Sequence, residues 1–150
     1  MKKVALAIHA TNDFDPTIMN AFEGLDYIHV DVMDGKFVKP TKLNLRVFEE
    51  LRKTSSLPIV AHLMVMDPLS YIEKIIDQID TLLFHFESEG DTWEVIKSVK
   101  DHGKQVGIVI NPDTDISKIT SYLGSVDFIL VMSVHPGWSG QEFLEESIQK

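Results

Sequence analysis

The chain has 150 residues, enough for one domain with a substantial hydrophobic core. Its 23 acidic and 14 basic residues leave a formal charge of −9, which argues against nucleic acid and anionic membranes as partners. The absence of cysteine excludes disulfides and thiolate metal sites, and no apolar run approaches the about 20 residues that a membrane-spanning helix needs. We therefore expect a cytoplasmic protein in which residues 1–150 form a single domain.

Short apolar runs rich in β-branched residues alternate with longer amphipathic runs along the chain. Strands that are apolar on both faces and separated by helices are typical of parallel βαβ units, and six such units suit either a doubly wound sheet or a barrel. The pattern predicts strands at 4–9, 27–32, 58–65, 81–86, 105–110 and 126–134, and helices at 15–22, 43–53, 68–79, 91–102, 115–123 and from 140 onward.

Polar residues near the ends of the predicted strands favour the barrel. In a (β/α)₈ barrel, the chemistry comes from the C-terminal ends of several strands, whereas a doubly wound nucleotide fold concentrates its signal in one glycine-rich first turn. The turn at 10–14 contains no glycine. We predict an α/β fold of the TIM-barrel type, incomplete, with about six βα units and truncated at its sixth helix. The polar residues are His9, His29, Asp31, His62, His85, Asn111, Ser133 and His135.

Two histidines and one aspartate form a compact candidate metal site. His29 and Asp31 are two positions apart, so both side chains lie on one face of their strand, and His62 lies on the next strand. Adjacent strands are about 4.8 Å apart, so the three side chains can meet. Imidazoles and a carboxylate suit zinc, iron(II) or manganese, and burial of all three without a ligand would be costly.

Other polar residues have plainer interpretations. We interpret His9, His85 and His102 as hydrogen-bonded core histidines and Glu87 as a solvated loop residue. The segment 111–114 suits a structural turn and a substrate contact equally well.

Three methionines and one glycine-containing loop follow the strands that carry this chemistry. Methionine is most often a core filler, and spacing alone does not assign Met33, Met64 and Met132 to a substrate site. The loop 134–143 contains Gly137 and Gly140, which let backbone amides approach a ligand such as a phosphate. By itself this loop is a weak motif that an ordinary turn also explains, and together with the metal set it suggests a lid or a loop on the phosphate side of the substrate.

Four segments resemble the ribulose-phosphate 3-epimerase family. The family's strand motif His-Val-Asp-Val-Met-Asp-Gly occurs without substitution at 29–35. The segments 62–65, 107–112 and 132–141 are similar to its third strand, fifth strand and sixth-strand loop, so the resemblance runs from about residue 25 to the end.

The resemblance implies a reaction and a role for each candidate residue. The reaction converts D-ribulose 5-phosphate to D-xylulose 5-phosphate at C3 through an enediolate, with a divalent metal and two acid/base carboxylates. Asp31 would be a catalytic carboxylate and a metal ligand, with His29 and His62 as further ligands. The substrate would contact His62, an apolar wall of Met33, Met64 and Met132, and the closing loop residues Gly137, Trp138, Ser139 and Gly140.

Two departures from the family pattern leave alternatives open. The family's second catalytic aspartate, also a metal ligand, lies on strand seven, and its main phosphate-binding turns follow strands seven and eight; residues 1–150 contain none of these. Residues 8–14 also differ from the family's first-strand turn. The alternative is a non-catalytic or partially active fragment that binds metal and sugar phosphate. A hexulose-phosphate lyase or synthase is disfavoured because no lysine accompanies Asp31. Open strand edges predict a homo-oligomer.

Overall fold

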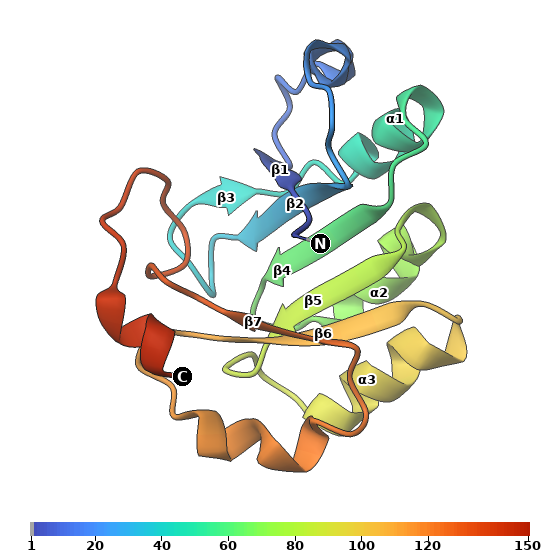
Figure 1. Ribbon diagram of the computed structural model, residues 1–150. Helices are drawn as coiled ribbons and strands as arrows, with labels where there is room; N and C mark the ends of the chain where they lie inside the picture. Colours follow the sequence, from blue (N-terminus) through green and yellow to red (C-terminus); the bar gives the residue numbers. More distant parts are fainter. Residues whose placement is uncertain (1) are drawn as a thin grey trace.

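The computed structural model describes residues 2–150, in which six parallel strands form one curled sheet (Figure 1). The strand order is β1-β2-β4-β5-β6-β7, and every neighbouring pair in that order is parallel. This half-barrel confirms the prediction of an incomplete TIM-type α/β fold. The parallel strands are β1 (Ala5–His9), β2 (Tyr27–Asp34), β4 (Ile59–Met64), β5 (Thr81–His85), β6 (Gln105–Ile110) and β7 (Phe128–Val131).

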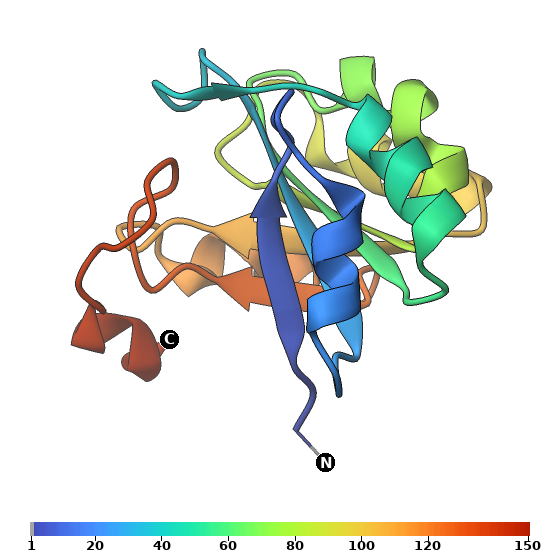
Figure 2. The same cartoon turned by 90° about the horizontal axis from the view of Figure 1, so that it is seen from above.

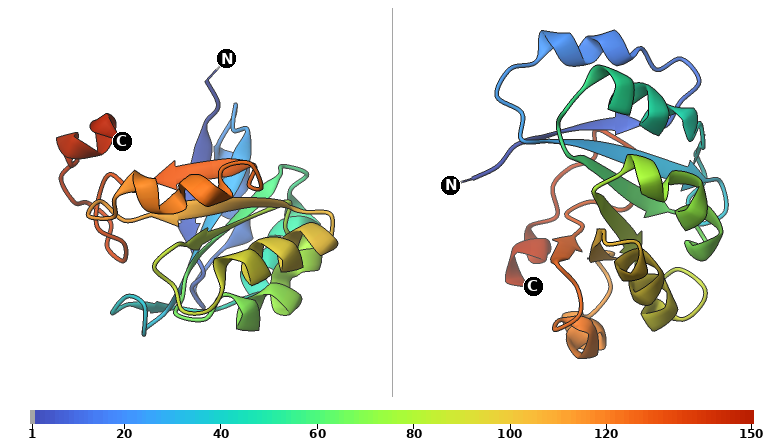
Figure 3. Two further views of the ribbon diagram at one scale, coloured as in Figure 1. Left: turned by 90° about the horizontal axis from the view of Figure 1, so that it is seen from below. Right: turned by 90° about the vertical axis from the view of Figure 1, so that its right-hand side faces the viewer.

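Three α-helices cover the outer face of the curled sheet, as Figures 2 and 3 show. They are α1 (Arg46–Thr54), α2 (Leu69–Ile75) and α3 (Thr92–Asp101). Among residues 2–150, no helix is long and apolar enough to cross a lipid bilayer.

Several of the predicted helices are 3₁₀-helices rather than α-helices. The segments η1 (Pro16–Ala21) and η3 (Ile116–Tyr122) begin at Asp15 and Asp115, whose side chains accept the amide two residues later. In η3, Ile119 is buried, and Ile116 and Tyr122 pack partly buried against the core, so the apolar positions repeat every three residues, as in a 3₁₀-helix. Two further 3₁₀-helices are η2 (Ile76–Gln78), which ends the predicted helix 68–79, and η4 (Glu145–Gln149), which begins five residues later than predicted.

The boundaries after the second strand were also predicted wrongly. Met33 and Asp34 belong to β2, where they pair with the short antiparallel strand β3 (Thr41–Lys42), which the pattern did not indicate. Helix α1 consequently starts at Arg46 rather than at residue 43. The Asp34 carboxylate accepts the amides of Lys36, Phe37 and Met66, so it joins the loops that leave β2 and β4.

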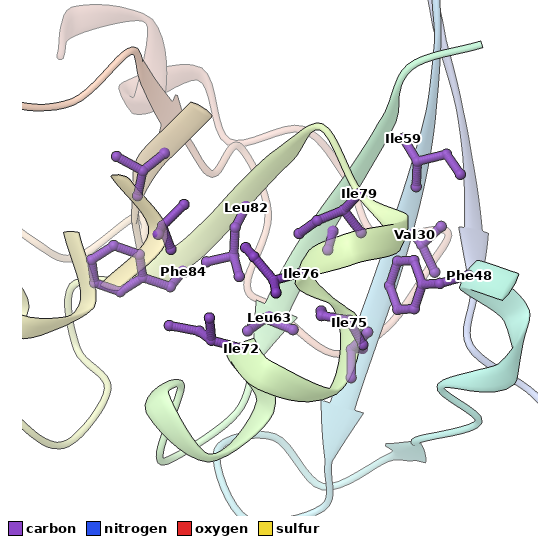
Figure 4. Packing of buried hydrophobic residues seen from close by; sticks show 14 of the residues in the cluster. Val30, Phe48, Ile59, Leu63, Ile72, Ile75, Ile76, Ile79, Leu82 and Phe84 are labelled. Atoms are coloured by element: carbon purple, nitrogen blue, oxygen red, sulfur yellow. The ribbon is translucent and has the colours of Figure 1, made fainter. Parts of the chain in front are cut away.

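The main hydrophobic core lies between the outer face of the sheet and the helices (Figure 4). On β2, alternate residues Ile28, Val30 and Val32 are fully buried on this face, while His29 and Asp31 point to the concave inner face. Phe48 of α1 packs into the same core with no exposed surface. Helix burial on one side therefore holds the strands and leaves the inner face for chemistry.

Gly107 on β6 is closely packed against its neighbours on the inner face. A Cβ atom at this position would lie 2.5 Å from Leu83 Cδ2, 2.9 Å from Phe128 Cβ and 3.0 Å from the Phe128 carbonyl oxygen. The Gly107→Ala substitution should lower the free energy of unfolding by about 1–3 kcal/mol because the backbone of β7 must shift. Urea titration followed by circular dichroism measures this change.

Gly124 offers a matched control, because a Cβ atom there meets no atom within 4 Å. Gly124→Ala should leave the free energy of unfolding unchanged within about 1 kcal/mol. Equal destabilisation by both substitutions would show that the close packing around Gly107 is not the cause.

Candidate metal centre and active site

Strand register brings the three predicted metal ligands together on the inner face. Asp31 of β2 lies directly opposite His62 of β4, and His29 lies two residues before Asp31 on the same face. The side chains of His29 and Asp31 are 19% and 17% exposed, while that of His62 is 3% exposed. The set is therefore sheltered by the sheet and open toward the concave side.

The distances within this set fit a metal ion. Asp31 Oδ1 lies 3.1 Å from His29 Nε2 and 2.8 Å from His62 Nδ1, and the two nitrogens are 3.3 Å apart. Two ligands each about 2.1 Å from zinc and about 90–109° apart at the ion lie about 3.0–3.4 Å from one another, so two of the three distances fall in this range and the distance between Asp31 and His62 is slightly shorter. One ligand atom from each residue therefore converges on a volume of the right size, and among the residues described these three form the group able to hold an ion.

Burial and hydrogen bonding give Asp31 and His62 the protonation states that metal ligands need. Burial opposes ionisation of Asp31, but hydrogen bonds with His29 and His62 outweigh it and hold its pKa well below the usual range. Burial lowers the pKa of His62 to about 4, against the raising effect of Asp31. Near neutral pH, the set therefore offers a carboxylate and a neutral imidazole.

A cavity of about 320 Å³ lies next to the three residues. Met33 lies two residues after Asp31 on β2, and Met64 of β4 lies opposite Met33. Together with Met132, which follows β7, these methionines form an apolar part of the cavity wall. The structure places all but one of the predicted site residues around this cavity. They are His29, Asp31, Met33, His62, Met64, Met132, Gly137, Trp138 and Ser139, while Gly140 does not line it.

The loop after β7 forms one side of the cavity and reaches the loop after β2 (Figure 1). Gly137 has a φ of +114°, and a Cβ there would lie 3.2 Å from Val38 Cβ, so glycine permits the approach. The Gln141 amide donates to the carbonyls of His135 and Trp138, which ties the loop to its own base. Trp138 is 66% exposed and stands at the rim.

Three of the plainer interpretations of polar residues were wrong. His9 is only partly buried and lines the cavity, and His102 is exposed at the end of α3 with Nδ1 bonded to the Ser98 carbonyl. Glu87 is not simply solvated, because its carboxylate accepts the Asn111 amide and the Thr114 hydroxyl and contacts His85. His85 alone is the buried histidine that was expected.

Five further residues line the cavity although none was assigned to the site from the sequence. They are His9, Leu130, Val134, His135 and Pro136. The available signal was that His9 and His135 are polar residues near strand ends and that 134–136 begin the glycine-containing loop, because the ends of parallel strands meet at one rim.

The pKa of His62 predicts how the stability of the metal-free protein changes with pH. An unfolded histidine titrates near its ordinary value of 6.5, whereas folded His62 titrates at about 4. Between these values the unfolded chain binds more protons, so the free energy of unfolding should fall as the pH decreases through this window. In a His62→Gln variant this fall should be smaller. Urea titrations at a series of pH values, with a chelator present, measure the difference.

His102→Gln is the matched control for this measurement, because His102 is exposed. It should retain the pH dependence of the unmodified chain. An unchanged dependence in His62→Gln would contradict the stated contribution of His62.

Comparison with known proteins agrees with these observations. Residues 5–150 match the model of the "Ribulose-phosphate 3 epimerase family". The chain is 39% identical to ribulose-phosphate 3-epimerase of Aquifex aeolicus, 37% identical to the chloroplastic ribulose-5-phosphate-3-epimerase of Arabidopsis thaliana and 33% identical to ribulose-phosphate 3-epimerase of Methanocaldococcus jannaschii.

Each of these similarities covers 85% of the chain and a smaller share of the relative. The matched region makes up 58%, 46% and 54% of the three relatives, in the same order, so the chain spans about half the length of these curated proteins. The family match over residues 5–150 nevertheless includes every described helix and strand and all three candidate metal ligands. The chain belongs to the ribulose-phosphate 3-epimerase family.

Proposed function

We propose that this chain contributes to metal-dependent epimerisation of a ketose phosphate at C3, converting D-ribulose 5-phosphate to D-xylulose 5-phosphate. The observation that carries the proposal is the convergence of His29, Asp31 and His62 beside one cavity at the C-terminal ends of the strands. Membership of the family supplies the class of reaction and of substrate. The cytoplasmic location stays a prediction from the sequence.

His29 Nε2, Asp31 Oδ1 and His62 Nδ1 would hold the divalent ion. Their mixed nitrogen and oxygen donors suit zinc, iron(II) or manganese. When bound, such an ion supplies positive charge that stabilises the negative oxygens developing on the substrate.

Asp31 is the residue that we assign to proton transfer. Its hydrogen bonds with both histidines end at Oδ1, so we expect Oδ2 to take the proton from C3 on one face of the substrate. Its lowered pKa keeps the carboxylate ionised and ready to accept that proton. Return of a proton to the opposite face requires a second acid.

The remaining cavity residues are assigned to substrate binding. Met33, Met64 and Met132 offer a polarizable apolar surface that excludes water from the reacting carbon. Together with His62, we assign the loop residues Gly137, Trp138, Ser139 and Gly140 to binding and covering the sugar phosphate. The first three of these loop residues line the cavity.

A second candidate function is supported by the composition of the ligand set. Among the residues described, the set contains one carboxylate, that of Asp31. A chain with one acid/base group would bind metal and sugar phosphate and exchange the C3 proton with solvent, without efficient epimerisation. Incorporation of deuterium from D₂O into ribulose 5-phosphate without formation of xylulose 5-phosphate would identify this case.

Asp31→Asn should remove the acid/base group while preserving most of the side-chain shape. With Mn²⁺ or Zn²⁺ present, formation of xylulose 5-phosphate should fall by about 10²–10⁴-fold, since loss of an acid/base group removes that much rate. Deuterium wash-in should fall equally if the chain only exchanges protons. Coupled detection of xylulose 5-phosphate and proton NMR measure the two outcomes.

Asp77→Asn provides the same chemical change at an exposed position in η2 and should leave both rates unaltered. Activity that survives in Asp31→Asn would remove Asp31 from the proposed mechanism.

We also expect the 150-residue chain to self-associate. In the part of the chain that is described, β1 and β7 stand at the two ends of the strand order and each pairs with one parallel neighbour. Unpaired strand edges promote pairing with another chain. Size-exclusion chromatography with light scattering should report a species larger than the 17.0 kDa monomer. A monomer at high concentration would contradict this expectation.

A further inference from the structure

Three side chains in contact, His62, His85 and Glu87, extend from the candidate metal centre into the protein interior. His62 faces the ligand set through Nδ1, and its other nitrogen, Nε2, lies 3.0 Å from His85 Nε2. His85 Nδ1 in turn lies 3.3 Å from Glu87 Oε2. His85 has no exposed surface, so its contact with His62 is sheltered from water, while Glu87 is partly exposed.

The two imidazole rings are arranged for an in-plane hydrogen bond. Their planes differ by 23°, and their centroids are 5.1 Å apart although the nearest nitrogens are only 3.0 Å apart. The rings therefore meet edge to edge, with one N–H directed at the lone pair of the other ring. The ring of Phe37, 4.7 Å away between centroids, packs against His85 on another side.

When His62 binds a cation, the donors and acceptors of His62, His85 and Glu87 allow only one placement of the imidazole protons. A ligating nitrogen needs a free lone pair, so Nδ1 of His62 carries no proton and Nε2 carries one. Nε2–H then donates to His85 Nε2, which must accept. The remaining nitrogen of His85, Nδ1, is therefore protonated and donates to the carboxylate of Glu87.

We propose that Glu87 is a positioning residue that selects the metal-binding tautomer of His62 by acting through His85. The proposal rests on the proposed metal site and adds residues that lie outside the ligand set. Glu87 accepts but does not donate, so it orients His85 with Nε2 as the acceptor. That acceptor fixes the proton of His62 on Nε2 and leaves Nδ1 free for the ion.

Glu87 is itself held in place by contacts from another element. Its Oε1 accepts the backbone amide of Asn111 at 2.9 Å and the hydroxyl of Thr114. Against the effect of burial, hydrogen bonds from His85, Thr114 and Asn111 lower the pKa of Glu87 to about 2, so the side chain is a carboxylate near neutral pH. The loop after β6 thereby sets the orientation of a group two side chains away from the ion.

The fixed amide of Asn111 makes Glu87→Gln a sharp test. A backbone N–H can only donate, so the glutamine must turn its oxygen toward Asn111 and its NH₂ group toward His85. His85 Nδ1 would then become an acceptor and Nε2 would carry the proton. That N–H would oppose the Nε2–H of His62 and favour the tautomer in which His62 Nδ1 is protonated and cannot bind a metal.

The experiment combines cobalt binding with NMR of the histidine nitrogens in the full chain. Visible absorption during Co²⁺ titration, with Zn²⁺ in competition, gives metal affinity, and long-range ¹H–¹⁵N correlation spectra assign the tautomers. Glu87→Gln should weaken Co²⁺ binding by about 10–100-fold, as losses of outer hydrogen-bond partners do in other metal sites. It should also move the proton of His85 from Nδ1 to Nε2.

Glu89→Gln makes the same change two residues away at an exposed position and should leave affinity and tautomers unaltered. Thermal unfolding shows whether each variant is folded at the temperature of the NMR measurement. A changed His85 tautomer in a folded variant is then not a consequence of lost structure. A Glu87→Gln variant with His85 still protonated on Nδ1, or with unchanged Co²⁺ affinity, would overturn the proposal.

The same measurements distinguish failure of this proposal from failure of the proposed metal site. With an ion bound to His62 Nδ1, contact with the Glu87 carboxylate requires a proton on His85 Nδ1, so the His85 tautomer is read in the Zn²⁺-loaded protein. In the metal-free protein, the Asp31 carboxylate accepts a proton from His62 Nδ1 instead, and two neutral imidazoles cannot then also supply Glu87. Absence of Co²⁺ binding in the unmodified chain would refute the metal site, and hence the role assigned to Glu87 toward it. Normal Co²⁺ binding in the unmodified chain, together with an unchanged His85 tautomer in Glu87→Gln, would refute only the positioning role of Glu87.

Discussion

The pairing of Asp31 with His62 across β2 and β4 is the interaction on which the site depends. A carboxylate removed from water is unfavourable unless hydrogen bonds or a cation compensate for the lost hydration. Two imidazoles supply those contacts, and together the three groups leave room for an ion. The parallel register between two strands therefore decides both the stability of this carboxylate and its possible chemistry.

The outer face of the sheet forms the hydrophobic core with the helices, and the inner face carries the candidate site. Alternate residues of β2 and β4, such as Val30 and Leu63, pack outward against the helices without exposed surface. Because the helices bind the outer face, the inner face can retain polar side chains. The same period of two that buries Val30 therefore presents Asp31 to the cavity.

Loops connect this site to more distant parts of the chain. Asp34 joins the loops after β2 and β4 through backbone amides, and Gly137 lets the loop after β7 contact Val38. Glu87 joins the loop after β5 to the loop after β6 through the Asn111 amide. Each contact occurs at the carboxyl ends of the strands, where the neighbouring loops of a parallel sheet converge.

The sequence by itself determined the alternation of strands and helices, the i, i+2 placement of His29 and Asp31, and the family motifs, because these depend on local periodicity and spacing. Only the tertiary structure decided that η1 and η3 are 3₁₀-helices and that Met33 and Asp34 extend β2 by pairing with β3. It also decided the contact between Glu87 and the amide of Asn111, which is 24 residues away. Contacts of that kind depend on register and loop approach, which local residue patterns do not encode.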